Sequence, residues 1–230
     1  MKELPVPVLY NKKPTVSADG SIMFYSMEYQ EAYRAKSVGA YTESRYKFVE
    51  ASGVLEKAKT QDVRILDLCF GLGYNCAVTF DLAIKKAVKN RIHIVSIEKD
   101  ETLHLLVRRL CYLWPLEGYR AVRTCLNKSI CGNLSMESLI TPAREALERL
   151  SGKFDAVYFD PFSPSKNPEM WRVEVFSRLK ELMAVGGVLV TYACGKTVQA
   201  NMSAAGFKVN TLEKVSGAFQ PGLRARLPHY

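Results

Sequence analysis

The chain has 230 residues, of which 48% are hydrophobic and 24% charged, a balance that is typical of globular proteins and excludes disordered or collagen-like chains. No apolar stretch reaches the roughly 18 to 20 residues of a membrane-spanning helix, and the first residues lack the apolar run of a signal peptide. We therefore expect a cytoplasmic protein with no membrane contact. Lys and Arg number 32 against 23 Asp and Glu, and this formal net charge of +9 favours a polyanionic partner such as nucleic acid.

The cysteines and histidines show no spacing that is typical of a metal site. The sequence has no C-x-x-C pair and its three histidines lie far apart, so we expect no bound metal. In a cytoplasmic chain the cysteines are expected to be reduced and mainly buried. Cys69 and Cys76 flank a glycine turn, which leaves a catalytic thiol open as an alternative.

The first sixty residues differ in pattern from the rest of the chain. Prolines and a glycine turn separate short extended pieces, of which residues 22–25 are the best strand candidate. Helical patterns are predicted from Glu28 and again over residues 42–55. We interpret residues 1–60 as an N-terminal extension packed on a main domain of residues 61–230.

From residue 63 onward, apolar strands alternate with amphipathic helices. We expect strands at 63–68, 92–97, 125–131, 154–159, 188–192 and 207–212, and helices at 74–87, 101–114, 136–150, 171–183 and 197–205. Continuous apolar strands between helices are typical of a parallel sheet that is covered on both faces.

The first candidate binding element is a glycine turn at the end of the strand 63–68. Gly71 and Gly73 follow this strand and open a helix, so a ligand can approach bare backbone and the N–H groups of a helix start. Asp67 precedes the turn. The third glycine of the dinucleotide fingerprint is replaced by Cys76, so a tight structural loop stays an alternative.

The second candidate is Glu98, which ends the next strand. A carboxylate at this position can accept hydrogen bonds from both hydroxyls of a ribose, as nucleoside cofactors require. The alternative is a solvated charge in the run Glu98-Lys99-Asp100. Together with the glycine turn, Glu98 favours a nucleoside cofactor.

The third candidate is Asp160, which ends the strand 154–159. Open α/β sheets bind their ligands in the crevice at this edge. Prolines stiffen the loop that follows and aromatic residues such as Phe162 and Trp171 wall it, so it is suited to hold a substrate against a fixed carboxylate. The alternative is that Asp160 caps a turn and the aromatics pack a structural loop.

Residues 159–171 resemble the Asp-x-Phe-x-Pro-x-Lys-Asn-Pro-x-x-Trp signature of the methyltransferase domain of the MnmC family. Residues 70–75 are similar to the Phe-Gly-x-Gly-x-Asn turn of that family, and residues 96–99 to its ribose-binding strand end. The resemblance covers residues 17–207. Two further segments are similar to the family's N-terminal signatures: residues 19–26 and 40–48.

The resemblance implies a Rossmann-like class I S-adenosylmethionine-dependent methyltransferase, an α/β fold with a mostly parallel seven-stranded sheet, helices on both faces and an N-terminal extension. Members of the family use S-adenosylmethionine to finish 5-methylaminomethyl-2-thiouridine at the wobble position of tRNA. The flavin oxidase domain of bifunctional members has no counterpart here. We therefore expect a stand-alone enzyme, with a monomer being plausible, that methylates the aminomethyl group of 5-aminomethyl-(2-thio)uridine in the anticodon stem-loop.

The resemblance also assigns roles to residues. Asp160 is the expected catalytic residue, which accepts hydrogen bonds from the substrate amine and helps to remove its proton. The residues expected to bind the cofactor are Tyr25, Glu43, Asp67, Gly71, Gly73, Asn75, Glu98, Lys99 and Asn133. Those expected to contact the substrate are Phe162, Lys166, Asn167 and Trp171.

Two departures from the family pattern concern the site. Gly132-Asn133 stands where many relatives have Gly-Asp on the adenine side, and the side-chain oxygen of an Asn can still bind the adenine amino group. Pro161 replaces the glycine that commonly follows the catalytic Asp, which makes the loop stiffer.

Two other functions stay open. An aminopropyltransferase-like enzyme has a similar sheet with an Asp-Pro at the same strand end, but its cationic polyamine substrates require an acid-rich site, and residues 159–171 supply only Asp160 and Glu169. A catalytically silent RNA-binding module could keep the nucleoside pocket for stability. Turnover of S-adenosylmethionine on undermodified tRNA separates the three.

Overall fold

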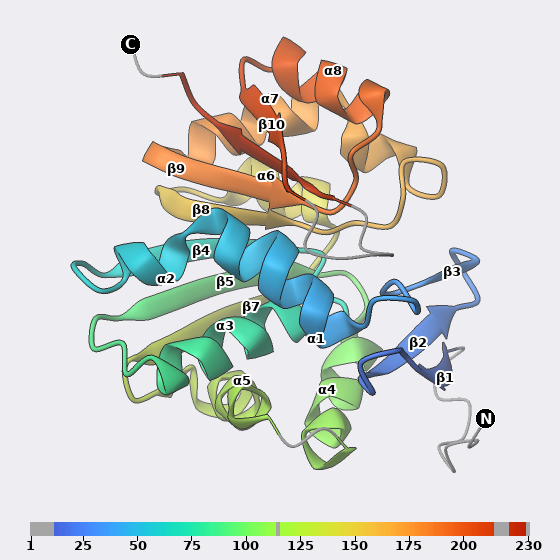
Figure 1. The fold of residues 1–230 in the computed structure, drawn as a ribbon, viewed down its shortest axis with the longest axis vertical. Coiled ribbons are helices and arrows are strands. Elements are labelled where there is room, and N and C mark those ends of the chain that lie inside the picture. The colour runs from blue at the N-terminus through green and yellow to red at the C-terminus, as the bar shows by residue number, and fades with distance from the viewer. Residues whose placement is uncertain (1–11, 114–115, 214–220, 229–230) are drawn as a thin grey trace.

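Eight strands make up the central sheet in the part of the chain that the computed structural model describes, residues 12–113, 116–213 and 221–228 (Figure 1). Their order across the sheet is β10 (Lys208–Thr211), β11 (Leu223–Arg226), β9 (Met183–Thr191), β8 (Phe154–Phe159), β4 (Val63–Leu68), β5 (Ile92–Glu98), β7 (Leu134–Ile140) and β6 (Ile130–Cys131). The five strands from β9 to β7 are parallel, and the outer pairs are antiparallel. The expected α/β fold with a mostly parallel sheet is confirmed, with an eighth strand when the two-residue β6 is counted.

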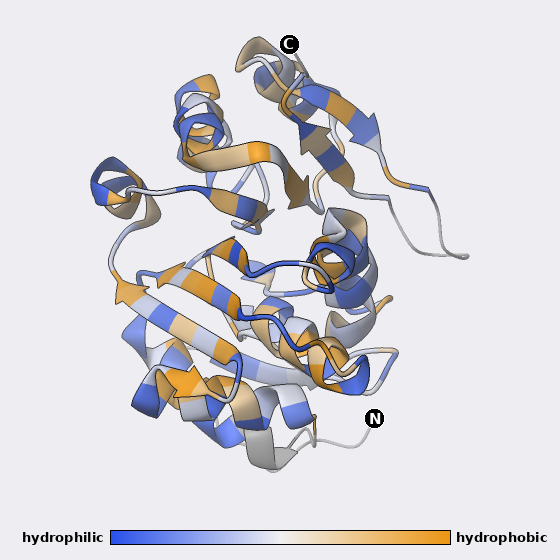
Figure 2. Ribbon diagram, turned by 90° about the vertical axis from the view of Figure 1, so that its left-hand side faces the viewer, coloured by the Kyte–Doolittle hydropathy of each residue, from blue (hydrophilic) through white to orange (hydrophobic). Residues whose placement is uncertain are grey.

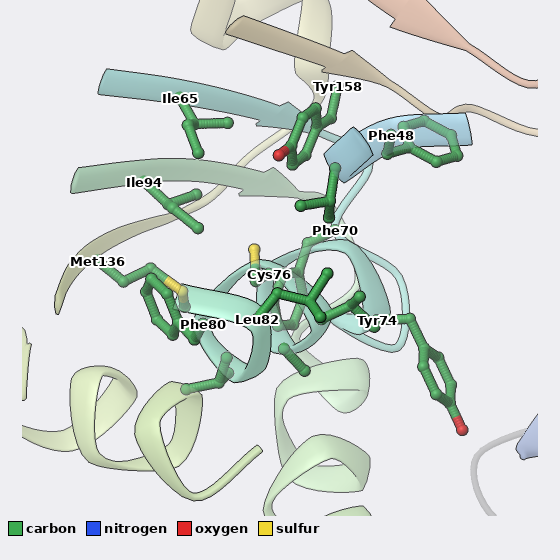
Figure 3. Close-up of a cluster of buried hydrophobic side chains, with 14 of the residues drawn as sticks. Phe48, Ile65, Phe70, Tyr74, Cys76, Phe80, Leu82, Ile94, Met136 and Tyr158 are labelled. Atoms are coloured by element: carbon green, nitrogen blue, oxygen red, sulfur yellow. The ribbon is translucent and has the colours of Figure 1, made fainter. Parts of the chain in front are cut away.

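Helices cover both faces of this sheet (Figure 1). The first face packs against α3 (Tyr74–Lys85), α4 (Glu101–Leu113) and α5 (Glu117–Lys128), and the second against α6 (Ala143–Arg149), α7 (Val173–Leu182) and α8 (Lys196–Ala204). Because successive strand residues point to opposite faces, Ile65 belongs to the first core and Leu66 to the second. Figure 3 shows Ile65 and Ile94 on neighbouring strands, in one cluster with Cys76 and Phe80 of α3.

The distribution of hydrophobic residues follows these layers. In Figure 2 hydrophobic residues run along the central strands, whereas the helices mix hydrophobic and hydrophilic residues. An amphipathic helix of this kind buries its apolar side against a sheet and leaves its polar side to water. None of the described helices is long and apolar enough to cross a membrane.

The N-terminal segment packs on the first face. Three antiparallel strands, β1 (Lys12–Val16), β2 (Ile22–Ser26) and β3 (Glu31–Ala32), precede α1 (Ala40–Glu43), the π-helix η1 (Ser44–Glu50) and α2 (Val54–Lys57). Ile22 and Phe48 belong to the same hydrophobic cluster as α3. The Tyr74 hydroxyl donates a hydrogen bond to the Ile22 carbonyl at 2.6 Å, and Lys12 forms an ion pair with Asp100 at 2.6 Å. These contacts tie the N-terminal segment to the loops at the strand ends.

The expected helix over residues 136–150 and the expected strand over 125–131 are both wrong. Residues 134–140 form β7, and the helix begins only at Ala143, because Pro142 cannot lie inside a helix. Leu134 and Met136 are buried while Ser135 and Glu137 between and after them are less so, which is the two-residue period of a strand. Residues 125–128 complete α5, so the strand there shrinks to β6.

Two further differences lie near the ends of the chain. The helix expected from Glu28 is a turn followed by β3, whereas the helical pattern over 42–55 is confirmed in outline by α1, η1 and α2. The sequence analysis does not predict β11, because its two basic residues hide the alternation with buried Leu223 and Ala225. Trp114 and Pro115, expected to end the helix that begins at Glu101, lie outside the described residues.

The order of the strands positions the site. The chain passes from β4 to β5 on one side, and returns to place β8 on the other side of β4. In doubly wound sheets, a crevice opens at the carboxyl ends of the strands where the winding reverses. Loops that follow β4, β5, β7 and β8 therefore meet around one point.

Candidate active site

A cavity of about 630 Å³ lies at this carboxyl edge of the sheet. Its volume is within the range of small-molecule sites. The loops after four strands line one part of it, and the N-terminal segment lines the rest. These lining stretches are residues 28–29, 31–36, 69–72, 97–100, 142–144 and 160–162, with Glu43, Asn167, Glu169, Met170 and Tyr192.

The turn after β4 brings backbone to the cavity. Gly71 and Gly73 have φ angles of +56° and +69°, in the left-handed region that favours glycine. Gly71 lines the cavity, whereas a Cβ atom on Gly73 would lie 2.6 Å from the ring of Phe70. The turn thus needs both glycines, one beside the ligand space and one against the core.

Glu98 ends β5 next to this turn. Its Oε2 accepts a hydrogen bond from the backbone N–H of Gly71 at 2.9 Å, and its Oε1 accepts one from Asp100 at 3.0 Å. Burial raises the pKa of Glu98, while these two N–H donors lower it. Each oxygen keeps further acceptor capacity, so a carboxylate in this position suits a pair of ribose hydroxyls.

Asp67 lies behind the turn and does not line the cavity. Its Oδ2 accepts a hydrogen bond from the Cys76 thiol at 3.1 Å, and its Oδ1 has no partner among the described residues. Burial raises the pKa of Asp67 to about 6. Burial also raises the pKa of the Cys69 and Cys76 thiols well above the usual range, which disfavours the open alternative of a catalytic thiolate.

Asp160 follows β8 and lines the cavity with a carboxylate that is 9% exposed. Its Oδ2 lies 2.5 Å from Nη2 of Arg34 and accepts a hydrogen bond from the Asn75 amide at 2.8 Å. Burial raises the pKa of Asp160 to about 7, and Glu43 adds to the rise, whereas Arg34 and Asn75 lower it. Neutral pH is therefore the range in which this carboxyl group titrates.

Arg34 belongs to a buried network of charges that the N-terminal segment supplies. Its side chain is 6% exposed and stacks over the Phe48 ring at 5.3 Å from the ring centre. Nη1 lies 3.8 Å from Glu43 and has no hydrogen-bond partner in the described part of the chain. Glu43 in turn accepts a hydrogen bond from Lys47 at 2.8 Å. Two cations and two carboxylates, counting Asp160, thus share one buried region beside the cavity.

The turn between β2 and β3 crosses the cavity mouth. Glu28 forms an ion pair with Lys99 at 2.8 Å, and the Tyr29 ring stacks on Phe162 with centroids 4.3 Å apart. Glu31 accepts hydrogen bonds from the backbone N–H and the hydroxyl of Ser163, the latter at 2.6 Å. The turn therefore bridges the loop after β5 and the loop after β8.

Trp171 packs against the loop that follows Asp160 and holds its backbone. Its indole N–H donates a hydrogen bond to the Phe162 carbonyl at 2.9 Å, and its ring, 3% exposed as a residue, packs edge-on against Phe159. The Tyr192 hydroxyl donates to the Pro161 carbonyl at 3.0 Å from the other side. These two bonds hold the backbone that follows Asp160.

The structure brings half of the expected site residues to the cavity. Those that line it are Glu43, Gly71, Glu98, Lys99, Asp160, Phe162 and Asn167. Asp67, Gly73 and Asn75 lie directly behind it, and Trp171 is a core residue of the loop. Tyr25 and Lys166 do not line it: the Tyr25 hydroxyl donates to Gln30 at 3.3 Å, and Lys166 is exposed.

The placement of Asn133 beside the adenine is wrong. Asn133 precedes β7, at the opposite edge of the sheet, and its amide donates to the carbonyls of Val88 and Asn90 at 3.0 and 2.8 Å. The resemblance matches Gly132-Asn133 to the family's Gly-Asp, but in the structure these two residues come before β7 and not after it. The residues that follow the actual end of β7 and line the cavity are Pro142 to Arg144.

Sequence reasoning misses most of the residues that the N-terminal segment supplies. Arg34, Tyr29 and Glu31 lie in a stretch with a helical pattern, and nothing local distinguishes a buried Arg from an exposed one. Tyr192 carries a better signal, because it directly follows an apolar strand, as Asp160 does.

Among the described residues no group of three or more His, Cys, Asp or Glu side chains is arranged to hold a metal ion. The charged groups at the cavity are instead paired with one another, as Asp160 is with Arg34 and Glu28 with Lys99.

Comparisons with known proteins point to one family. The profile of a family described as S-adenosyl-L-methionine-dependent methyltransferase matches residues 102–227. The tRNA 5-methylaminomethyl-2-thiouridine biosynthesis bifunctional protein MnmC of Pseudomonas fluorescens is 33% identical over 183 residues, 73% of this chain and 28% of that protein. The protein of the same name from Leptospira borgpetersenii is 29% identical over 190 residues, 76% of this chain and 29% of that protein.

A solved structure resembles the whole described fold. The crystal structure of MnmC2 from Aquifex aeolicus has a TM-score of 0.82 and 32% sequence identity, over 96% of this chain and 72% of that chain. The chain spans between a quarter and a third of the length of the curated relatives named above, which are 28% and 29% covered.

Proposed function

Because the chain belongs to this family of S-adenosyl-L-methionine-dependent methyltransferases, as its motifs predict, we propose that it methylates the aminomethyl group of 5-aminomethyl-(2-thio)uridine at the tRNA wobble position. The observation that carries the proposal is the position of Asp160, which lines the same cavity as Gly71 and Glu98. A carboxylate that can accept hydrogen bonds from an amine thus lines the same cavity as groups that can bind a nucleoside. The product, a 5-methylaminomethyluridine, is what the MnmC relatives are named for making.

S-adenosylmethionine fits the groups at the ends of β4 and β5. Glu98 suits the ribose hydroxyls, Gly71 lets the ligand approach backbone, and Glu43 offers a carboxylate for the ammonium of the methionine end. The loop Pro142 to Arg144 replaces Asn133 as the candidate for the adenine end. When bound, the cofactor supplies a methyl group that its positive sulfur activates toward nucleophiles.

Asp160 acts on the other reactant, the amine. A primary alkylamine is largely protonated at neutral pH and has no lone pair to offer in that state. An ionised Asp160 accepts hydrogen bonds from the amine, directs its lone pair and helps to remove the proton. Binding the two reactants side by side in one cavity supplies the remaining rate enhancement, because an aligned pair no longer has to meet by diffusion.

The charge of the cavity suits an amine. Seven carboxylate residues and four cationic residues line it, so the cavity is rich in acids although residues 159–171 supply only two of them. Such a lining attracts a protonated aminomethyl group and equally a polyamine. Family membership favours the methyltransferase, and the choice of cosubstrate and acceptor in the experiment below separates the two.

Aromatic residues at the mouth suit an extruded base. The stacked rings of Tyr29 and Phe162 line the cavity within reach of the Asp160 loop. Proteins commonly read single-stranded RNA by stacking its bases on aromatic side chains. Phe162 thus keeps its proposed substrate role, and Tyr29 takes the place of Trp171.

Basic residues at the same mouth suit the tRNA backbone. Lys36, Lys99 and Arg144 are exposed and line the cavity. A denser basic group lies at the end of α3 and just after it, at the opposite edge of the sheet: Lys85, Lys86, Lys89 and Arg91. We therefore propose that the tRNA contacts the protein at the cavity mouth. A tRNA substrate also implies that the enzyme works in the cytoplasm.

The RNA contact predicts an affinity that depends on salt and on these side chains. Between about 50 and 200 mM salt, tRNA affinity should fall by roughly ten- to a thousandfold, because phosphate contacts release counterions. Lys36→Glu and Arg144→Glu should each weaken binding in a filter-binding assay. Lys89→Glu makes the same change of charge at the far edge, and an equal loss there would move the contact away from the cavity mouth.

Transfer of labelled methyl groups tests the function itself. The purified protein is incubated with S-adenosylmethionine and tRNA that carries 5-aminomethyl-2-thiouridine, and the nucleosides are analysed by mass spectrometry. The proposal predicts one methyl group on the wobble uridine. Tight cofactor binding without transfer would indicate a silent RNA-binding module, and product only from decarboxylated cofactor and a polyamine would indicate an aminopropyltransferase.

A further inference from the structure

Arg34 reaches the reactive carboxylate from outside the central sheet. It follows β3, and its guanidinium lies 2.5 Å from Asp160 in a region where it is 6% exposed. We propose that Arg34 is a positioning residue for methyl transfer: it holds Asp160 by Oδ2 in the ionised form and leaves Oδ1 to accept the hydrogen bond of the substrate amine. The inference rests on the proposed function and adds to it the residue that prepares the base.

The hydrogen bonds of Asp160 are one-sided. Arg34 and Asn75 both bind Oδ2, at 2.5 and 2.8 Å. Oδ1 receives no hydrogen bond from the described residues and is not among their buried unpartnered atoms, and Asp160 lines the cavity. Two donors on one oxygen fix the plane of the carboxylate, so the second oxygen has a set direction toward the ligand space.

Charge explains why a cation is needed here. Asp160 is surrounded by groups that oppose its ionisation, and burial alone favours its neutral form. A neutral carboxyl group cannot take a proton from an amine. The charged or titratable groups that face Asp160 are Arg34, Glu43, Asp67, Cys69 and Tyr192. Of these, Arg34 is the cation, and its attraction offsets the repulsion of the two carboxylates.

The proton balance of the step is simple. The protonated amine first gives one proton to Oδ1 of Asp160, which frees the lone pair of the nitrogen, and Asp160 passes that proton to water. The lone pair then forms the nitrogen–methyl bond while the bond between the methyl carbon and the sulfonium sulfur breaks, and the neutral thioether leaves. The carboxylate is regenerated, and the step needs no oxidant or reductant. Arg34 stays charged throughout because its pKa lies far above neutral pH.

A purely structural role for Arg34 makes different predictions. Buried ion pairs contribute little net stability, but removal of one partner leaves an uncompensated charge and costs stability. Arg34→Met should therefore destabilise the fold under either interpretation. Loss of stability cannot decide between them, so the test compares kinetics and titration with a matched control.

Lys47→Met is that control. Lys47 is 4% exposed and binds the other carboxylate of the network, Glu43, at 2.8 Å. Its removal also deletes a buried cation, but one that the ion pair with Asp160 does not involve. Arg34→Lys is the conservative variant, which keeps the charge and loses the planar fork.

The kinetic readout is the pH profile of kcat at saturating tRNA and S-adenosylmethionine. In Arg34→Met the acid limb should move to higher pH by about one unit or more, because an opposite charge at this distance lowers a carboxyl pKa by one to three units. Arg34→Lys should restore part of the shift, and Lys47→Met should move the limb by less than half as much as Arg34→Met, because Lys47 acts on Asp160 only through Glu43. The substrate amine ionises in the same way with every variant, so its ionisation cannot explain a difference between their acid limbs.

A double-mutant cycle adds the second readout. Arg34→Met should lower kcat at neutral pH by about tenfold or more in the natural chain, but by less than about threefold in an Asp160→Asn background. Equal losses in both backgrounds, with an unmoved acid limb, would overturn the role of Arg34 while leaving the methyltransferase intact.

A titration without turnover separates this inference from the function. With ¹³C-labelled aspartate, the carboxyl resonance of Asp160 is assigned by its absence in Asp160→Asn and followed with pH in the free protein. Its pKa should rise by about one unit or more in Arg34→Met and by less than half as much in Lys47→Met. This result holds even if the substrate proposed above is wrong, and an unchanged pKa of Asp160 in Arg34→Met contradicts the inference whatever the substrate is.

Discussion

The ends of β5 and β8 each carry a buried carboxylate, yet the two are built differently. Glu98, at the end of β5, is held by backbone N–H groups of Gly71 and Asp100. Asp160, at the end of β8, is held by the side chains of Arg34 and Asn75. Burial raises the pKa of both groups.

This difference matches two tasks. Backbone donors cannot change their charge and hold Glu98 in one orientation, which suits binding. A cation beside Asp160 offsets the cost of burying its charge and leaves it titrating near neutral pH, which suits proton transfer. Under the proposed function, the partners of a carboxylate at a strand end therefore decide whether it serves as a ligand or as a base, and those of Asp160 come partly from outside the sheet.

The largest expected effect is on Asp160. Asp160→Asn keeps the shape of the side chain but removes its charge, so kcat for tRNA methylation should fall by roughly two to four powers of ten. The Kd for S-adenosylmethionine should change little, because the groups at β4 and β5 hold that ligand. Higher pH should recover part of the rate, since more of the amine is then neutral. A near-natural rate at all pH values would remove Asp160 from the mechanism.

For Glu98 we expect a smaller effect, which falls on the affinity for S-adenosylmethionine and not on kcat. Glu98→Ala should weaken S-adenosylmethionine binding by about 1.5 to 3 kcal/mol, the range of hydrogen bonds to charged groups, as measured by calorimetric titration. Glu98→Gln should lose less, because it keeps one acceptor oxygen. Unchanged affinity in both variants would take Glu98 out of the cofactor site.

The pH dependence of folding should reveal the raised pKa of Asp160. Burial raises its pKa to about 7 in the folded chain, against about 3.9 when unfolded. Between these values the folded state binds more protons than the unfolded state, so this group makes the free energy of unfolding fall as pH rises from about 4 to 7. Asp67 acts in the same direction up to about 6. Denaturant unfolding of Asp160→Asn should show a less negative pH slope than the natural chain, and identical slopes would contradict the raised pKa.

The smallest effect on cofactor binding is expected at Asn133. Asn133→Ala removes two hydrogen bonds to the carbonyls of Val88 and Asn90, which should cost about 1 to 3 kcal/mol of unfolding free energy. Affinity for S-adenosylmethionine should stay the same, in contrast to Glu98→Ala. A clear loss of affinity in a variant that is still folded would restore Asn133 to the adenine side.

The sequence predicts the residues that the sheet itself positions. Glu98 and Asp160 each follow an apolar strand, and parallel strands end at one edge, so their meeting follows from local pattern. Gly71 and Gly73 predict the tight turn after β4, because residues other than glycine rarely adopt their positive φ angles.

What the sequence does not predict depends on tertiary packing. Arg34 is buried only because the N-terminal segment folds back over the sheet, and no local pattern encodes that path. Asn133 is misplaced because the match of Gly132-Asn133 to the family's Gly-Asp does not show on which side of β7 the two residues lie.

The single-turnover rate constant of methyl transfer at saturating S-adenosylmethionine tests the central claim most directly. The natural chain, Glu98→Ala and Asp160→Asn are each mixed with tRNA that carries 5-aminomethyl-2-thiouridine, at cofactor concentrations well above each measured Kd. The account predicts that Glu98→Ala recovers most of the natural rate once the cofactor is saturating, while Asp160→Asn stays slower by roughly two to four powers of ten. Equal rates for the two variants would contradict the division of tasks between the ends of β5 and β8.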